Sequence, residues 1–273
     1  MLLPFDELDH PLIIAHRGSA VLAPENTLYA FDLALSTGAD VLEMDVHPSA
    51  DGEVMVIHDP TVDRTSNGKG SVGAMTRKEL QKLDFAWQFS IEGTEGYPLR
   101  GQGISIPTLA EVLKRYRSTP MSIDIKHDDP NFATEVVKVV LKADARERVV
   151  LGSFHPRIAR LLGGAVPRLH TAADRRQSIR LLRKSLLRRR MRGADLPSAY
   201  MLPARLGRFM IASRTLVHTI HEVGRRGYFW TIDDEPTMVR LLVRGVDGIV
   251  TNRPDLLFSL RRAWTSGEEA APF

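Results

Sequence analysis

Short apolar runs alternate along the chain with longer segments in which apolar residues recur at the spacing of a helix. The runs predict eight strands, at 12–16, 41–46, 121–126, 149–154, 168–172, 199–202, 228–232 and 247–251. The segments between them predict helices at 27–36, 109–116, 131–142, 158–162, 178–190, 214–225 and 236–243. Because strands that alternate with helices build parallel βα units, the pattern predicts an α/β fold. We expect a (β/α)8 TIM barrel, with residues 1–273 forming a single domain.

One interval between predicted strands is too long for a simple βα loop. Asp51 and Gly52 mark a hairpin turn after the second strand, and an apolar return run follows at 54–57. A glycine-rich polar stretch then covers 61–103. We therefore expect a small insertion after strand two, at about 47–106, that forms a flap over the mouth of the barrel.

Composition narrows the chemistry that such a barrel can carry. The chain is 43% hydrophobic and 26% charged, which is typical of a globular protein and excludes a disordered chain. It contains no cysteine, so a thiolate nucleophile and a cysteine-ligated zinc are excluded. Any metal would be held by oxygen or nitrogen ligands.

Carboxylates recur on two predicted strands. Glu43 and Asp45 are two residues apart and face the same side of their strand, and Asp124 and Lys126 repeat this spacing on the next strand. Carboxylates inside a barrel repel one another unless a cation neutralises them. Three carboxylates suit Mg²⁺ or Ca²⁺ as a cofactor. The alternative for a pair such as Glu43 and Asp45 alone is a salt bridge or a strand-end cap.

Two histidines and an arginine follow predicted strands, where barrel enzymes place their functional residues. His16 and His58 suit general acid–base catalysis near neutral pH, and Arg17 offers a planar, charged fork for phosphate oxygens. Together with Lys126 and a metal, they match the needs of phosphoryl chemistry. Trp230 either forms a wall of the substrate pocket or belongs to the core.

An ordered series of motifs in this chain resembles the glycerophosphodiester phosphodiesterases. The motifs are IAHRG (14–18), APENT (23–27), GAD (38–40), EMDV (43–46), DG (51–52), HD (58–59), DRT (63–65), NG (67–68), IPTL (106–109), WT (230–231) and GVDGIVT (245–251). They span nearly the whole chain in the order of that family. The resemblance implies a (β/α)8 barrel with an insertion after strand two.

The resemblance also implies a role for each candidate residue. His16 and His58 would be the paired acid–base histidines, Arg17 and Lys126 the phosphate contacts, and Glu43 and Asp45 metal ligands. Asp124 stands where many members carry the glutamate of a Glu-x-Lys string, and it would be the third metal ligand with a shorter side chain. Glu25 and Asn26 are expected to organise the first loop, with Asn26 capping the helix at 27–36, and His47 is expected to face out of the barrel.

The activity implied is metal-dependent hydrolysis of glycerophosphodiesters to an alcohol and glycerol 3-phosphate. Asp124 also resembles the lysophospholipase D branch of the family, so the alternative substrate is a lysophospholipid. A non-catalytic phospholipid-binding barrel is a third reading, which would be expected to lack a catalytic histidine or a metal carboxylate. A metal-dependent aldolase would explain the carboxylates, but it would give His16, His58 and Arg17 no common role in the reaction.

The net charge of +4 is concentrated in one segment. Between Arg175 and Arg192 the chain has nine basic residues and no acidic one, whereas the whole chain has 37 basic and 33 acidic residues. The remainder is therefore mildly acidic, unlike a nucleic-acid-binding surface. One interpretation of 175–192 is an outer barrel helix with a solvated basic face and an apolar face of Ile179, Leu182 and Leu186. The other is peripheral contact with an anionic membrane surface.

No apolar run approaches the roughly 20 residues that span a bilayer. The first residues lack Lys and Arg and include Asp6, Glu7 and Asp9, unlike a signal peptide. We therefore expect a cytoplasmic protein, which could also contact the inner membrane surface through residues 175–192. The sequence identifies no oligomeric interface.

Overall fold

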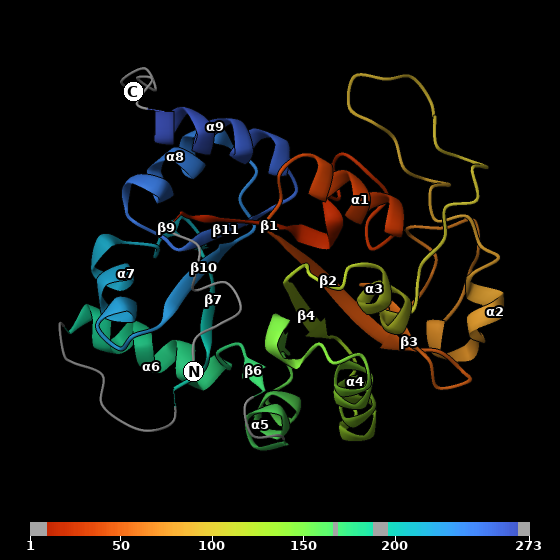
Figure 1. Cartoon of the computed structure of the whole chain (residues 1–273), viewed down its shortest axis with the longest axis horizontal. Helices are drawn as coiled ribbons and strands as arrows, with labels where there is room; N and C mark the ends of the chain where they lie inside the picture. Colours follow the sequence, from red (N-terminus) through yellow and green to blue (C-terminus); the bar gives the residue numbers. More distant parts are fainter. Residues whose placement is uncertain (1–9, 166–168, 188–195, 267–273) are drawn as a thin grey trace.

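The computed structural model describes residues 10–165, 169–187 and 196–266, and its main sheet is a parallel barrel (Figure 1). Neighbouring strands follow the order β6-β5-β4-β2-β1-β11-β10-β7, and each of these pairs is parallel. A single parallel bridge between Ala172 and Ala199 joins the two ends of this order. The strands are β1 (Leu12–Ala15), β2 (Val41–Pro48), β4 (Met121–Ile125), β5 (Val149–Gly152), β6 (His170–Thr171), β7 (Ala199–Pro203), β10 (Arg226–Trp230) and β11 (Gly248–Thr251).

Each of the eight predicted strands has its counterpart in this barrel, so the predicted fold class is confirmed. The boundaries differ by a few residues. The first strand ends at Ala15 because the chain turns into the short 3-10 helix η1 (His16–Gly18). Residue 168, at the start of the fifth predicted strand, lies outside the described residues.

Helices surround the barrel in Figure 1. They are α1 (Leu28–Ser36), α3 (Leu109–Arg115), α4 (Pro130–Lys142), α5 (Pro156–Ala165), α6 (Arg175–Leu186), α7 (Arg214–His221), α8 (Glu235–Val243) and α9 (Pro254–Ser266). The sequence pattern had not predicted α9. None of the helices in the described ranges is long and apolar enough to cross a membrane.

Two local predictions about helices are wrong. Thr27, not Asn26, caps α1, since its hydroxyl accepts from the backbone N–H of Ala30 at 3.1 Å. On α6 the predicted apolar face of Ile179, Leu182 and Leu186 is not the buried one. The helix instead buries Leu181 against the barrel, with Leu182 only partly covered, and residues 188–190 of the predicted helix lie outside the described part of the chain.

The barrel interior is apolar at its amino-terminal end and polar at its mouth. Alternate strand residues such as Ile14, Val41 and Tyr228 pack together inside it. Because side chains two residues apart share a face, Glu43 and Asp45 follow Val41 on the inward side of β2. The register pairs Asp45 with Asp124 of β4, which places two carboxylates on adjacent strands.

The insertion leaves the barrel at the carboxyl end of β2 (Figure 1). It begins with β3 (Val54–Val56), which pairs antiparallel with β2 as the hairpin signal predicts, and continues through η2 (Val72–Ala74) and α2 (Arg77–Leu80). A small core of its own holds the insertion together, formed by Met55, Ile57, Val62, Val72, Leu80, Phe85 and Ile106. A short antiparallel ribbon, β8 (Arg205–Leu206) and β9 (Phe209–Met210), follows β7.

We predict that alanine at position 248 destabilises the barrel. Gly248 lies between Leu12 and Tyr228, and an added Cβ would stand 2.9 Å from the Leu12 carbonyl oxygen and 2.9 Å from a ring carbon of Tyr228. Gly248→Ala should lower the free energy of unfolding in urea by about 1–3 kcal/mol, because the strands must move apart. Gly163 of α5 has no atom within 4 Å of an added Cβ, so Gly163→Ala should instead raise it by about 0.5–1 kcal/mol. Equal midpoints for the two variants would contradict this prediction.

Candidate active site

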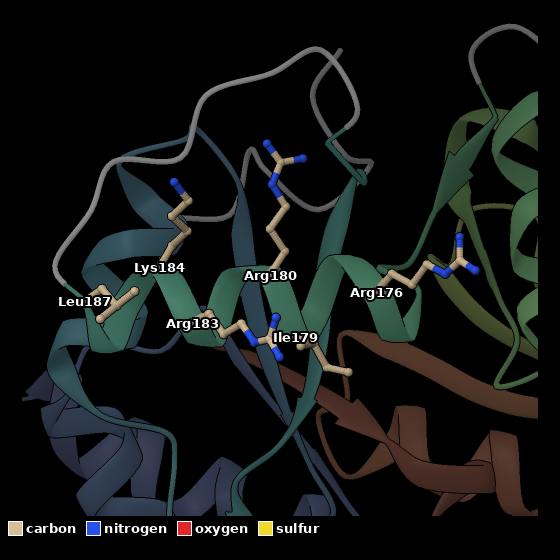
Figure 2. Close-up of a pocket in the computed structure, with 6 residues that line it drawn as sticks. All are labelled: Arg176, Ile179, Arg180, Arg183, Lys184 and Leu187. Atoms are coloured by element: carbon tan, nitrogen blue, oxygen red, sulfur yellow. The ribbon is translucent and has the colours of Figure 1, made fainter.

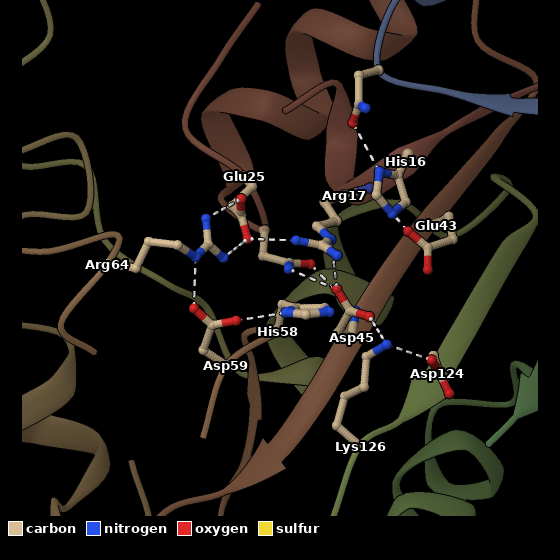
Figure 3. Close-up of polar contacts among 12 residues, drawn as sticks. His16, Arg17, Glu25, Glu43, Asp45, His58, Asp59, Arg64, Asp124 and Lys126 are labelled. Carbon is tan, nitrogen blue, oxygen red and sulfur yellow. Dashed lines mark hydrogen bonds and ion pairs between the residues drawn. The ribbon is translucent and has the colours of Figure 1, made fainter. Parts of the chain in front are cut away.

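The side chains that the sequence singled out gather at the mouth of the barrel. Figure 3 shows Asp45 at the centre of this group, with Arg17, His58 and Lys126 around it. They come from η1, from β2, from the loop after β3 and from the end of β4.

His16 is held by a chain of hydrogen bonds that crosses to the last barrel strand. Its Nδ1 lies 2.8 Å from Oδ1 of Asn252. Asp233 accepts from the Asn252 side-chain nitrogen at 2.8 Å and from its backbone N–H at 2.7 Å, so the amide oxygen must be the atom that faces His16. His16 therefore donates from Nδ1, and its Nε2 carries the lone pair. Burial and the charge of Arg17 lower the pKa of His16, which keeps the ring neutral.

The loop at Arg17 has an uncommon backbone conformation. Arg17, Gly18 and Ser19 all have positive φ, at 52°, 74° and 82°. At Gly18 a Cβ would also stand 2.6 Å from a ring carbon of Phe31, so this turn requires glycine. The turn directs the backbone N–H of Arg17 to Oε2 of Glu43, at 2.9 Å. Strained backbone of this kind is typical of functional sites.

Asp45 is the most enclosed charge in the site, with 1% of its surface exposed. Lys126 Nζ lies 3.0 Å from its Oδ1, and Arg17 Nε lies 3.2 Å from its Oδ2. Asn26, the residue expected to cap α1, instead donates its side-chain N–H to Oδ2 at 3.1 Å. Burial alone would raise the pKa of Asp45, but Lys126, Arg17 and His58 outweigh it and lower the pKa.

Glu43 and Asp124 are also buried, but fewer positive or hydrogen-bond-donating groups stabilise their negative charge than stabilise that of Asp45. Burial and the neighbouring Asp45 raise the pKa of Glu43 well above its ordinary value. Burial also raises the pKa of Asp124, although Lys126 donates to its Oδ2 at 2.6 Å. The other oxygen of Asp124, Oδ1, is buried without a hydrogen-bond partner. The site therefore holds more carboxylate than its cations neutralise.

His58 belongs to a second chain of contacts that returns to Arg17. Its Nδ1 lies 2.6 Å from Asp59, and the Arg64 guanidinium contacts Asp59 at 2.6 Å. The same guanidinium forms two hydrogen bonds with Glu25, at 2.8 and 2.6 Å. Glu25 in turn accepts from Arg17 at 3.1 Å. Arg64 thus connects the histidine of the insertion to the arginine of the first loop.

The chemistry of the donors fits a hard divalent cation. Glu43, Asp45 and Asp124 supply only oxygen atoms, and the buried Oδ1 of Asp124 has an unused acceptor site. The arrangement is not a closed set of ligands, because Lys126 lies between Asp45 and Asp124. Within the ranges that the structure describes, no three acidic or histidine side chains converge as they would around a metal ion.

Trp230 contributes to an aromatic corner beside this cluster. Its ring meets that of Phe154 edge to face, with centroids 5.8 Å apart. Lys126 Nζ lies 5.4 Å from the Phe154 ring centroid, and Phe154 is 67% exposed. Trp230 also packs against the apolar residues inside the barrel. It therefore lies at the top of the core, beside the mouth of the barrel, and its part in a substrate pocket stays a prediction.

Two further histidines stabilise backbone near the site. The expectation that His47 faces out of the barrel is wrong: Met44 and Val46 pack in the outer core, so His47 shares the side of β2 that carries Asp45, and its Nε2 lies 3.0 Å from the carbonyl oxygen of His58. Burial lowers the pKa of His47 to about 4, so the ring is neutral and donates this hydrogen bond. His155 Nε2 lies 2.8 Å from the carbonyl oxygen of Lys126. Both contacts hold the backbone that carries a site residue.

Several residues of the site were missed by the sequence reasoning. Asn252 directly follows a predicted strand, so the rule that singled out His16 also applied to it. Arg64 lay within a quoted motif but received no role. Asp233 directly follows a predicted strand and Phe154 ends one, so the same rule reached both positions, but each acts through a partner brought close only by folding.

Comparisons with known proteins identify the family of the chain. A family model described as "Glycerophosphoryl diester phosphodiesterase family" matches residues 16–256. A glycerophosphodiester phosphodiesterase from Caldanaerobacter subterraneus subsp. tengcongensis is 33% identical over 256 residues, which cover 92% of this chain and 98% of the relative.

Solved structures show the same fold. The glycerophosphoryl diester phosphodiesterase domain of a Mycobacterium tuberculosis protein has a TM-score of 0.83 at 20% identity, covering 93% of this chain and 100% of that one. A phosphodiesterase from Oleispira antarctica, solved in complex with the product sn-glycerol-3-phosphate, has a TM-score of 0.70 at 23% identity and covers 92% and 96%. The family match and the relative's identity confirm the resemblance: the chain belongs to the glycerophosphoryl diester phosphodiesterase family of enzymes.

Proposed function

We propose that this chain hydrolyses glycerophosphodiesters to an alcohol and glycerol 3-phosphate by paired-histidine catalysis. The observation that carries the proposal is the placement of His16 and His58 on elements that meet around Arg17, Asp45 and Lys126 (Figure 3). The names of the relatives support this substrate class, and they lend no support to a lysophospholipase D or to a non-catalytic barrel. The product bound in the Oleispira antarctica structure is consistent with the proposed product.

The two histidines have different surroundings and so suit different steps. His16 is neutral and has a lone pair on Nε2, so it accepts the proton of the substrate's glycerol 2-hydroxyl as that oxygen attacks phosphorus, and water opens the resulting cyclic phosphate to glycerol 3-phosphate in a second step. His58 is fixed through Nδ1 by Asp59, which leaves Nε2 to donate a proton to the departing alkoxide. Arg17 and Lys126 bind the phosphate oxygens and stabilise the negative charge that grows in the transition state.

Glu43, Asp45 and Asp124 would hold Mg²⁺ or Ca²⁺. When bound, such an ion supplies positive charge against the phosphoryl oxygens. The support is the excess of buried carboxylate and the unpartnered Oδ1 of Asp124. Lys126 neutralises part of that charge and, in this proposal, turns to the substrate phosphate when the cation is present.

His16→Ala and His58→Ala are each expected to lower kcat for glycerophosphocholine by roughly 10²- to 10⁴-fold, because each removes a proton-transfer group. The assay should include lysophosphatidylcholine, with Mg²⁺ and Ca²⁺ varied. The exposed His218 of α7 provides a control, since His218→Ala should retain full activity. Wild-type activity in either site variant would refute the proposed chemistry, and a preference for lysophosphatidylcholine would refute the substrate.

Removing divalent metal should abolish hydrolysis and lower Tm, because the buried carboxylates would then repel one another. Added Mg²⁺ or Ca²⁺ at 100 times its Kd should stabilise the protein by about 2.7 kcal/mol, measured by thermal unfolding. Asp124→Asn should weaken this effect. Asp32→Asn, at an exposed carboxylate paired with Arg115, should leave it unchanged. Full activity in the presence of a chelator would argue against the metal.

Asn252→Ala is expected to lower kcat by about tenfold with little change in KM, because His16 loses the hydrogen bond that fixes its tautomer. Steady-state kinetics on glycerophosphocholine measure both constants. Asn131→Ala, at an exposed position in the first turn of α4, is the matched control and should match the wild type. An unchanged kcat for Asn252→Ala would show that Asn252 does not position His16.

A further inference from the structure

Helix α6 exposes aliphatic side chains that an ordinary outer helix of a barrel would bury. Leu186 is 83% exposed, Leu187 is 62% exposed and Ile179 is 39% exposed. The helix uses Leu181 and the partly covered Leu182 to pack against the barrel. Its outer surface therefore exposes three large apolar side chains to water. Contact with a partner would remove the unfavourable free energy of this exposure.

The same surface carries cations from a segment of the chain that contains no acidic residue. Nine basic residues and no acidic one lie between Arg175 and Arg192. Elsewhere arginines pair with carboxylates, as Arg115 does with Asp32 at 2.7 Å and Arg253 with Asp255 at 3.0 Å. Arg176, Arg183 and Lys184 form no ion pair with the residues that the structure describes.

The cations and the aliphatic groups share one hollow. Its volume is about 450 Å³, and its lining residues are Arg176, Ile179, Arg180, Arg183, Lys184 and Leu187. Figure 2 shows Arg180 and Lys184 extending on the same side of α6. A hollow of this composition suits a partner that is both negatively charged and apolar.

We propose that this surface of α6, lined by the residues in Figure 2 together with Leu186, binds an anionic phospholipid bilayer. Anionic headgroups neutralise the basic side chains, and the interfacial region accepts the exposed leucines. A nucleic acid would pair with the cations but would leave Leu186 and Leu187 in water, so the aliphatic groups decide between the two partners. The binding does not depend on the catalytic residues, although it would bring the enzyme close to lipid-derived substrates.

Flotation of the full-length protein with vesicles tests this proposal. We expect binding to phosphatidylcholine vesicles that contain phosphatidylglycerol, and little to pure phosphatidylcholine. The triple variant Arg176→Gln, Arg183→Gln, Lys184→Gln should lower the partition coefficient on the order of 100-fold. The control variant Lys114→Gln, Lys138→Gln, Lys142→Gln removes the same charge from exposed positions on α3 and α4 and should bind nearly as the wild type does.

A second variant tests the apolar part of the surface. Leu186→Ser with Leu187→Ser should weaken vesicle binding by about tenfold or more at unchanged charge. All variants should keep the wild-type circular dichroism spectrum and rate on soluble glycerophosphocholine. The proposal is overturned if the two triple variants bind vesicles equally, if the wild type does not bind, or if it binds duplex DNA as tightly as anionic vesicles. Because flotation requires no turnover, these results stand apart from the outcome of the activity assays.

Discussion

The structure of the site depends on the repulsion among three buried carboxylates. Glu43, Asp45 and Asp124 are inward-facing because residues two apart on a strand share a face, and the register of β2 with β4 places Asp45 beside Asp124. Lys126 and Arg17 relieve part of the repulsion, while burial and the charge of Asp45 raise the pKa of Glu43 and of Asp124. The left-handed turn at 17–19 and the amide of Asn26 both serve to bring positive or donor groups to this cluster.

The insertion takes part in this electrostatic arrangement as well as carrying His58. Arg64 bonds to Asp59 and to Glu25, so the position of the insertion and that of the Arg17 loop are coupled through one guanidinium. A displacement of either segment would separate charges that lie 2.6 Å apart. The separate core of the insertion and this shared arginine together explain how a long excursion from the barrel holds a side chain in a fixed place.

Features of the structure that depend on local sequence patterns were predicted, whereas features that depend on contacts between distant parts of the chain were not. The eight strands were predictable because apolar runs and helical spacing are local signals, and Glu43, Asp45 and His16 were predictable from their positions on those strands. The contacts of Asp233 and Phe154 were not, although both residues stand at the ends of predicted strands, because their partners lie many residues away. The buried face of α6 was predicted incorrectly, since helical spacing favoured the row of Ile179, Leu182 and Leu186, whereas packing against the barrel buries Leu181, which has only polar residues three and four positions away. Asn26 was assigned a cap by its residue type, whereas the turn before α1 directs it to Asp45.

The hydrogen bond between His16 and Asn252 joins the first strand of the barrel to the last. It spans 236 positions of the chain, and Asp233, which fixes the amide, also comes from near the carboxyl end. During synthesis on the ribosome His16 therefore lacks this partner until residue 252 has been made. A translation product interrupted before Asp233 and Asn252 would hold the histidines and the carboxylates but not the hydrogen bonds that fix the tautomer of His16.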